Sequence, residues 1–145
     1  MHWMARSLPI LVLAAAPALA GAQSAVVAVE EENFRATPNG VIVAELLEGA
    51  RLVLGDARGR WREATLEAWI WEPSVRPDDR DGHDLAVSVQ DGENLRATPN
   101  GRRIGRAREG MLLDRIGTQG RWVRVRRTAW IWGPSIRATE PPASP

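Results

Sequence analysis

The chain has 145 residues, 44% of them hydrophobic and 26% charged, with a formal net charge of +1. This balance is typical of a folded globular protein and excludes a chain that is disordered throughout, while the length allows one ordinary domain or two small ones. Cysteine is absent, which excludes disulfides, a thiol nucleophile and a cysteine-based zinc site.

Residues 1–22 have the pattern of a secretory signal peptide. Arg6 supplies a short basic region, residues 8–16 an apolar core, and Ala18-Leu19-Ala20 a small-x-small cleavage pattern. The apolar run is shorter than the roughly 20 residues that span a bilayer, so we expect no stable membrane span after cleavage. The competing interpretation is a retained N-terminal anchor. Either form is exported, and we expect a periplasmic or extracellular protein.

The rest of the chain repeats itself at an offset of 61 residues. Residues 24–75 align without a gap on residues 85–136, and the densest match is ENFRATPNG against ENLRATPNG. An ungapped match over about fifty residues indicates two tandem copies of one small domain. The predicted division is therefore a first domain at 24–75, a polar linker at 76–84, a second domain at 85–136 and a disordered Pro-rich tail at 137–145.

Short strand patterns separated by turns recur within each copy. In the second copy, Val87 and Val89 alternate with polar residues, and further strands are expected at 94–97, 111–116 and 122–126, with tight turns at 98–101 and 117–120. No window shows a helical period with caps, because Gly, Pro or a β-branched residue interrupts each one. We predict an all-β fold made of small barrels.

No set of residues with catalytic or metal-binding spacing emerges. The two histidines, His2 and His83, both lie outside the repeated copies, so neither copy has one for acid–base work. The acidic linker has Asp79, Asp81 and Asp84, but its spacing fails the EF-hand pattern, which favours a solvated segment. We therefore expect no enzyme, no metal site and no cofactor.

The tryptophans fall on predicted outward faces. Side chains alternate along a strand, so Val123 and Val125 share the core face while Trp122 shares the other with Arg124. By the same argument Ile131 is a core residue, and Trp130 and Trp132 form an outward patch that meets Trp122. The alternative is that Trp122 covers the open end of a barrel with too little core. The candidate binding residues are Trp61, Trp69, Trp71, Trp122, Trp130 and Trp132, together with Arg121 and Arg124.

The two copies differ in two respects. In the first copy Arg62 stands where the second has Val123, so we expect a weaker core there unless the arginine extends its head group to the edge. Residues 32–75 hold five Arg against seven acids, whereas residues 93–136 hold ten Arg against three. The basic second copy favours an anionic partner, or else it is a solvated face or docks onto the acidic first copy. Nucleic acid is not expected for an exported protein.

Both copies carry the same ordered set of short motifs: N-x-R-x-x-P-x-G, a Gly before an apolar strand, G-x-W-x-x-V, and a small residue followed by Trp-Ile. The first copy has Ala64 in place of the Val. This order resembles the bacterial Src-homology-3 (SH3b) domain. In the second copy the residues are Asn94, Arg96, Pro99, Gly101, Gly110, Gly120, Trp122, Val125 and Ala129-Trp130-Ile131.

The resemblance implies two tandem small SH3-like β-barrels after the signal peptide, without catalytic activity. It also implies recognition of cell-wall peptides or envelope proteins, through a groove lined by the positions of Trp61 and Trp122 and of Trp69 and Trp130. The leading expectation is thus an exported binding module for a peptidoglycan peptide or an envelope protein. The alternative is a structural or regulatory subunit whose tryptophan patches are buried against each other or against a partner protein.

Overall fold

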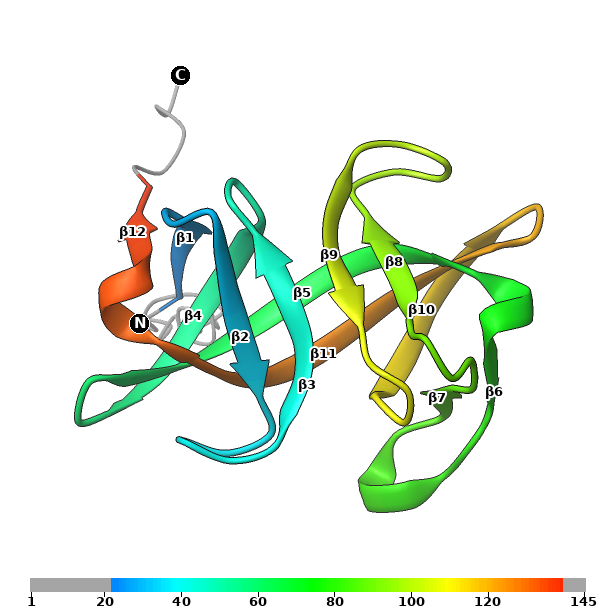
Figure 1. The fold of residues 1–145 in the computed structure, drawn as a ribbon, viewed down its shortest axis with the longest axis horizontal. Coiled ribbons are helices and arrows are strands. Elements are labelled where there is room, and N and C mark those ends of the chain that lie inside the picture. Colours follow the sequence, from blue (N-terminus) through cyan, green and yellow to red (C-terminus); the bar gives the residue numbers. More distant parts are fainter. Residues whose placement is uncertain (1–21, 140–145) are drawn as a thin grey trace, which may run out of the picture.

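A computed structural model describes residues 22–139 (Figure 1). The predicted cleavage pattern and apolar core of the signal peptide, and residues 140–145 of the predicted tail, lie outside this range. The strands are β1 (Gln23–Val27), β2 (Glu31–Arg35), β3 (Ile42–Leu47), β4 (Arg51–Arg58), β5 (Trp61–Trp71), β6 (Val75–Pro77), β7 (Leu85–Val87), β8 (Glu93–Arg96), β9 (Arg103–Ala107), β10 (Leu112–Gln119), β11 (Trp122–Trp132) and β12 (Ile136–Ala138), and the 3₁₀ turns are η2 (Glu72–Ser74), η3 (Arg80–Gly82) and η4 (Gly133–Ser135).

The prediction of an all-β fold is confirmed for the described residues. Two local expectations were wrong. Residues 117–119, expected in a tight turn, are the end of β10, and the turn falls at Gly120 and Arg121. Strand β9 was not expected, because its sequence RIGRA has too little apolar alternation to stand out.

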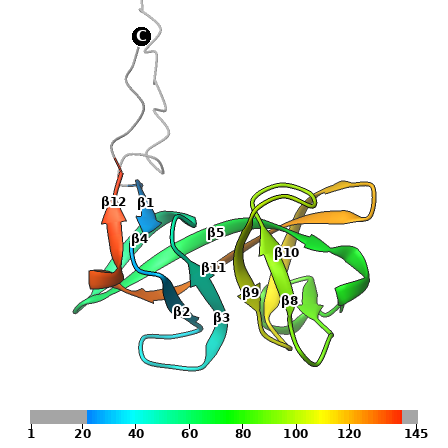
Figure 2. The ribbon, with the colours of Figure 1, turned by 45° about the horizontal axis from the view of Figure 1, so that its top comes forward.

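The largest difference from expectation is the length of β5 and β11. Each was expected as two short strands, yet each is one strand of eleven residues. The reason lies in the sequence: neither WREATLEAWIW nor WVRVRRTAWIW contains Gly, Pro, Asn or Asp, the residues that close tight turns. The two strands pair antiparallel over their whole length, from Trp122 opposite Trp71 to Trp132 opposite Trp61. Figures 1 and 2 show them as a long ribbon that runs through both halves of the molecule.

The repeat and the pairing together define a local two-fold axis. Leu66 pairs with Arg127, and Glu45 on β3 pairs with Arg106 on β9. In both cases the two partners are equivalent positions of the two copies, 61 residues apart. A residue that pairs with its own counterpart must lie on a two-fold axis, so the copies face each other as the subunits of a symmetric dimer do.

The sheet closes into a six-stranded barrel with extra strands on either side. The closed ring follows the order β5, β8, β9, β3, β2, β11 and returns to β5. Beyond β5 the sheet continues through β4 and β1 to β12, and beyond β11 it continues through β10 and β7 to β6. The first copy thus contributes three strands to the ring and the second copy three.

Strand pairing repeatedly crosses the boundary between the two copies. Strand β2 of the first copy pairs with β11 of the second, and β8 of the second pairs with β5 of the first. At the edges, β1 pairs with β12 and β6 pairs with β7. The division at 24–75 and 85–136 follows the sequence repeat, whereas the hydrogen-bonded sheet combines strands from both copies on each side of the molecule.

The repeated Glu-Asn and Pro-Ser dipeptides form hydrogen bonds between the two copies, whose strands are exchanged in the sheet. Ser135 of the second copy donates its hydroxyl hydrogen bond to the Glu32 carboxylate of the first. Reciprocally, Ser74 Oγ of the first copy donates to Glu93 Oε1 of the second at 2.5 Å. Both serines are buried, and a buried hydroxyl needs such a partner. Glu32 and Glu93 therefore each bind the copy to which they do not belong.

The repeated Arg-Ala-Thr-Pro-Asn-Gly segment forms a braced turn. Asn39 has φ 55°, and the Arg35 guanidinium donates to the Gly40 carbonyl at 2.8 Å. A Cβ atom on Gly40 would lie 2.0 Å from Thr37 Oγ1, so a larger residue here would require Thr37 to move. The second copy repeats this geometry, with Arg96 donating to the Gly101 carbonyl at 2.8 Å. The densest part of the repeat is therefore explained by turn structure.

The predicted linker, residues 76–84, begins inside β6, which includes Arg76 and Pro77, and its remaining residues connect β6 to β7. The two strands pair, with Val75 opposite Val87 and Pro77 opposite Leu85. In the connecting loop, a side-chain hydrogen bond from Arg80 is the main cause that lowers the pKa of Asp78 to about 2. His83 Nδ1 lies 3.1 Å from the Asp114 carboxylate on β10. The first contact lies within the loop, and the second attaches the loop to the second copy.

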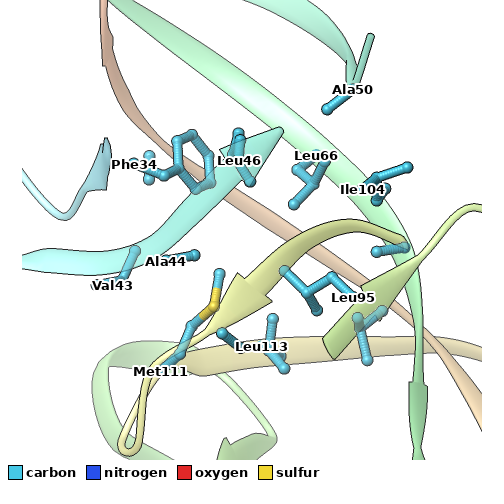
Figure 3. Close-up of a cluster of buried hydrophobic side chains, with 14 of the residues drawn as sticks. Phe34, Val43, Ala44, Leu46, Ala50, Leu66, Leu95, Ile104, Met111 and Leu113 are labelled. Carbon is cyan, nitrogen blue, oxygen red and sulfur yellow. The ribbon is translucent and has the colours of Figure 1, made fainter. Parts of the chain in front are cut away.

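The core is one continuous cluster to which both copies contribute. Phe34 and its counterpart Leu95 are both fully buried, as is Leu46. Figure 3 shows Phe34 beside Leu46, with Leu95, Met111 and Leu113 extending the same apolar interior from the second copy. Because the two copies share strands and a core, they must unfold together.

We predict that Leu95→Ala lowers the free energy of unfolding of the whole molecule. The truncation leaves a cavity in the shared core, which costs about 2–5 kcal/mol. Urea denaturation followed by far-UV circular dichroism and by tryptophan fluorescence should give one coincident transition, shifted in the variant. Val41→Ala, at a side chain that is 73% exposed, is the control and should change little. Two separate transitions would contradict the shared architecture.

Candidate functional site

The outward face of the β5 and β11 ribbon gathers all the described tryptophans. Buried residues alternate with partly or fully exposed ones along most of both strands. The expected core positions are confirmed: Ile70, Ile131 and Val123 are 0% exposed and Val125 is 1% exposed. The six tryptophans lie in the opposite row and are each partly exposed, namely Trp61, Trp69, Trp71, Trp122, Trp130 and Trp132.

These tryptophans pack across the two copies and not within each copy. Trp61 lies against Trp132 with ring centroids 5.1 Å apart, and Trp71 lies against Trp122 at 5.2 Å, both edge to face. The expectation that Trp130 and Trp132 meet Trp122 was wrong, because one continuous strand carries all three. Trp122 and Trp130 are eight residues apart on β11, or roughly 26 Å at about 3.3 Å per residue. The ribbon therefore has one tryptophan cluster at each end.

One cluster has arginines stacked on its rings, and we call it the Arg-covered end; it consists of Trp61, Trp130 and Trp132. The Arg58 guanidinium lies 5.0 Å from the Trp130 ring centroid and Arg60 lies 5.2 Å from that of Trp132. Arg35 lies 5.9 Å from the Trp61 ring. Each contact is a cation–π interaction that occupies a ring face.

The opposite cluster is less covered, and we call it the open end; it consists of Trp69, Trp71, Trp122, Arg121 and Arg124. Arg121 lies 5.2 Å from the Trp71 ring. Within residues 22–139, no cation lies over Trp69 or Trp122. The difference follows from the sequence, because Gln119 stands at the position equivalent to Arg58. Arg124 lies directly opposite Trp69 across the ribbon.

Both ends are built on a tight hairpin whose tip is tied to the other copy. Gly120, at the first central position of the β10–β11 turn, has φ 59°, as a type II′ turn requires. The carbonyl of Arg121 accepts a hydrogen bond from Glu72 N at 2.9 Å. At the Arg-covered end the carbonyl of Arg60 accepts from Gly133 N at 2.8 Å. These bonds fix the arginines that follow each turn glycine beside the tryptophans.

Part of the basic surface is neutralised within the chain. Arg124 and Arg126 both form ion pairs with Glu67 of the first copy, at 3.2 and 3.1 Å. Arg108 likewise pairs with Glu45 of the first copy. These contacts support the interpretation that the basic copy docks onto the acidic one. Arg127 is only 8% exposed, and burial lowers its pKa from the ordinary value.

Between residues 22 and 139 no three His, Cys, Asp or Glu side chains are grouped so that they could hold a metal ion. Nor does this part of the chain contain a helix long and apolar enough to cross a membrane.

Comparisons with protein-family models, with curated proteins and with solved structures find no match for this chain.

We predict that double-mutant cycles will show coupling across the copies. Edge-to-face aromatic pairs contribute about 0.5–1.5 kcal/mol beyond their buried area. The pair Trp71→Ala and Trp122→Ala should therefore give a coupling of that size in the free energy of unfolding. The pair Trp122→Ala and Trp130→Ala, on one strand but far apart, should be additive within about 0.5 kcal/mol. The reverse pattern would show that the tryptophans cluster within each copy.

Proposed function

We propose that this protein is an exported, non-catalytic binding module related to tandem SH3b proteins, and that it recognises a cell-envelope ligand at the open end of the ribbon. The preferred ligand is a peptidoglycan peptide, with an envelope protein as the second choice. The observation that carries the proposal is the collection of six tryptophans on one outward face, with a cluster at one end that arginines cover less.

The open end combines the groups that bind a peptide. Trp69 and Trp122 offer broad apolar ring faces and indole N–H donors, which suit stacking against a peptide or a sugar. Arg121 and Arg124 flank them on the same ribbon. Arginine binds carboxylates through a planar fork of N–H donors, so the open end favours a ligand with apolar and carboxylate groups close together.

A groove beside the middle of the ribbon extends this surface. It encloses about 710 Å³ and is lined by Val53, Thr65, Glu67 and Arg126, among others. Glu67 is two residues from Trp69 on the same strand face, so the groove adjoins the open end. The negative charge of Glu67 is balanced by Arg124 and Arg126. An extended chain held at Trp69 would continue into this groove.

The Arg-covered end favours the structural alternative for its own tryptophans. Trp61 and Trp132 pack on each other, and arginines occupy a face of each ring. Rings whose faces are occupied by such contacts stabilise the fold and offer less accessible area to a ligand. We therefore assign the Arg-covered end a stabilising role, and the two ends serve as mutual controls.

We predict that Trp69→Ala abolishes retention of the purified protein on peptidoglycan sacculi in a pull-down assay. Removal of one stacking aromatic at the centre of a binding site costs at least about 2 kcal/mol, or roughly thirtyfold in affinity. The matched control is Trp130→Ala, the equivalent position of the other copy, which should keep full retention. Circular dichroism of both variants establishes that each is folded.

Equal retention of the two variants would remove the open end as the site. Absence of wild-type retention would overturn peptidoglycan as the ligand. In that case an envelope protein would be sought with the same variant pair.

We also predict that Glu67→Gln raises retention. The substitution releases Arg124 and Arg126 from their shared carboxylate and makes the surface beside Trp69 more positive. Exposed ion pairs contribute up to about 1 kcal/mol, so the gain should be up to about fivefold, and it should shrink as salt is added. Retention that falls on this substitution would show that Glu67 itself binds the ligand.

A further inference from the structure

Arg62 occupies a position in β5 that its counterpart uses for the core. It stands two residues before Ala64 in the inward-facing row, and the equivalent residue of the second copy, Val123, is 0% exposed. The expected weakness of the first copy is thus localised: a charged side chain enters one end of the interior where the other copy has an apolar one. Such a residue normally needs a set of hydrogen-bond acceptors.

The protein supplies few of those acceptors. Arg62 Nη2 donates to the Gly55 carbonyl at 3.2 Å. Its Nε atom is buried and has no hydrogen-bond partner within the described residues, and no acidic side chain among them forms an ion pair with Arg62. An arginine head group has five N–H donors, so most of its binding capacity is unused here.

A pocket adjoins this head group. It has a volume of about 290 Å³, and its lining includes Arg60, Arg62 and Gln23 as polar residues and Leu54, Pro134 and Ile136 as apolar residues. The polar residues are all donors of hydrogen bonds, and two of them are cationic. The walls thus combine positive charge with a small apolar surface.

The symmetry-related position at the other end of the molecule has acids where this pocket has neutral residues. Asp84 takes the place of Gln23, and Glu72 takes the place of Gly133, which also lines the pocket. Together with Val123 in place of Arg62, these differences convert a site suited to an anion into one that repels it. The combination of residues that suits an anion therefore occurs at only one of the two symmetry-related positions of the described structure.

We propose that the pocket beside Arg62 binds a small carboxylate with a short aliphatic body. The carboxylate accepts hydrogen bonds from the two Nη atoms of Arg62, in a bidentate arrangement of the kind that guanidinium groups favour. The aliphatic part packs against Leu54, Pro134 and Ile136. Its source is either a free acid or the C-terminal residue of a peptide. Arg60 lies over Trp132, so this site is at the Arg-covered end and is separate from the open end.

The test is titration of the ¹⁵N-labelled protein while the Arg62 Nε–H resonance is monitored by NMR. Isobutyrate should shift this resonance saturably, whereas isobutyramide, its uncharged analogue, should not. Acetate should bind about tenfold more weakly, because it lacks the methyl groups that contact the apolar wall. Comparison of isobutyrate with N-acetyl-alanyl-alanine distinguishes a free acid from a peptide C-terminus, since the better ligand identifies the source.

Arg62→Val, which installs the residue of the second copy, should abolish binding and leave the protein folded. Arg62→Lys keeps the charge but loses the fork, and should weaken binding at least tenfold. Equal binding of acid and amide by the wild-type protein, no saturable shift with any acid, or unchanged isobutyrate binding by Arg62→Val would each overturn the proposal. The first two outcomes are measured on the wild-type protein, so the proposal can be overturned even if the Arg62→Val variant does not fold. Retention on peptidoglycan sacculi is a separate measurement that uses the Trp69→Ala variant, so the two proposals can fail independently.

Discussion

The antiparallel pairing of β5 with β11 is the interaction on which the rest of the molecule depends. Both strands run through eleven residues without a turn-forming residue, so neither copy folds its two tryptophan segments back on each other. Each segment instead finds its neighbour in the other copy. Strands β2 and β8 then add to the ribbon from opposite copies, and the barrel closes. The buried Ser74–Glu93 and Ser135–Glu32 bonds are available only after this exchange.

Two-fold symmetry places identical residues opposite each other on the axis of a dimer, whereas two copies within one chain can carry different residues there. In a dimer of identical chains, residues on the axis face themselves, and two like charges opposite each other destabilise a sheet. Here Glu45 faces Arg106, so opposite charges meet at one such point. Leu66 faces Arg127 at the other, and Arg127 donates to the Leu112 carbonyl at 2.9 Å. The uneven distribution of arginine between the copies is in part a consequence of this pairing, and not only a signal of an anionic partner.

The sequence was sufficient to predict which side chains of a strand face the core, because this depends on one strand alone. It was not sufficient to predict which side chains of different strands meet, because this depends on strand pairing. Alternation placed Val123, Ile131 and Ile70 in the core because side-chain direction has a period of two, whatever the partner. The same alternation says nothing about whether Trp122 meets Trp130 or Trp71. The missing turn chemistry between Val125 and Ala129 was the available signal that these segments form one strand. The covering of Trp130 by Arg58 depends on contacts across copies, which no periodicity encodes.

The departures from symmetry fall at the two sites for which we propose different ligands. Residues that build the exchange are the same in both, as with Glu32 and Glu93 or Arg35 and Arg96, because each copy needs them equally. At one end the second copy has Gln119 where the first copy has Arg58, which leaves Trp69 without a covering arginine. At the other end the first copy has Arg62 where the second copy has Val123, which places a cation beside a pocket. Neither change touches the pairing of β5 with β11, so the fold tolerates both. A strand-exchanged duplicate can therefore carry two different binding surfaces on one shared core, since the residues that specify the core are not those that contact a ligand.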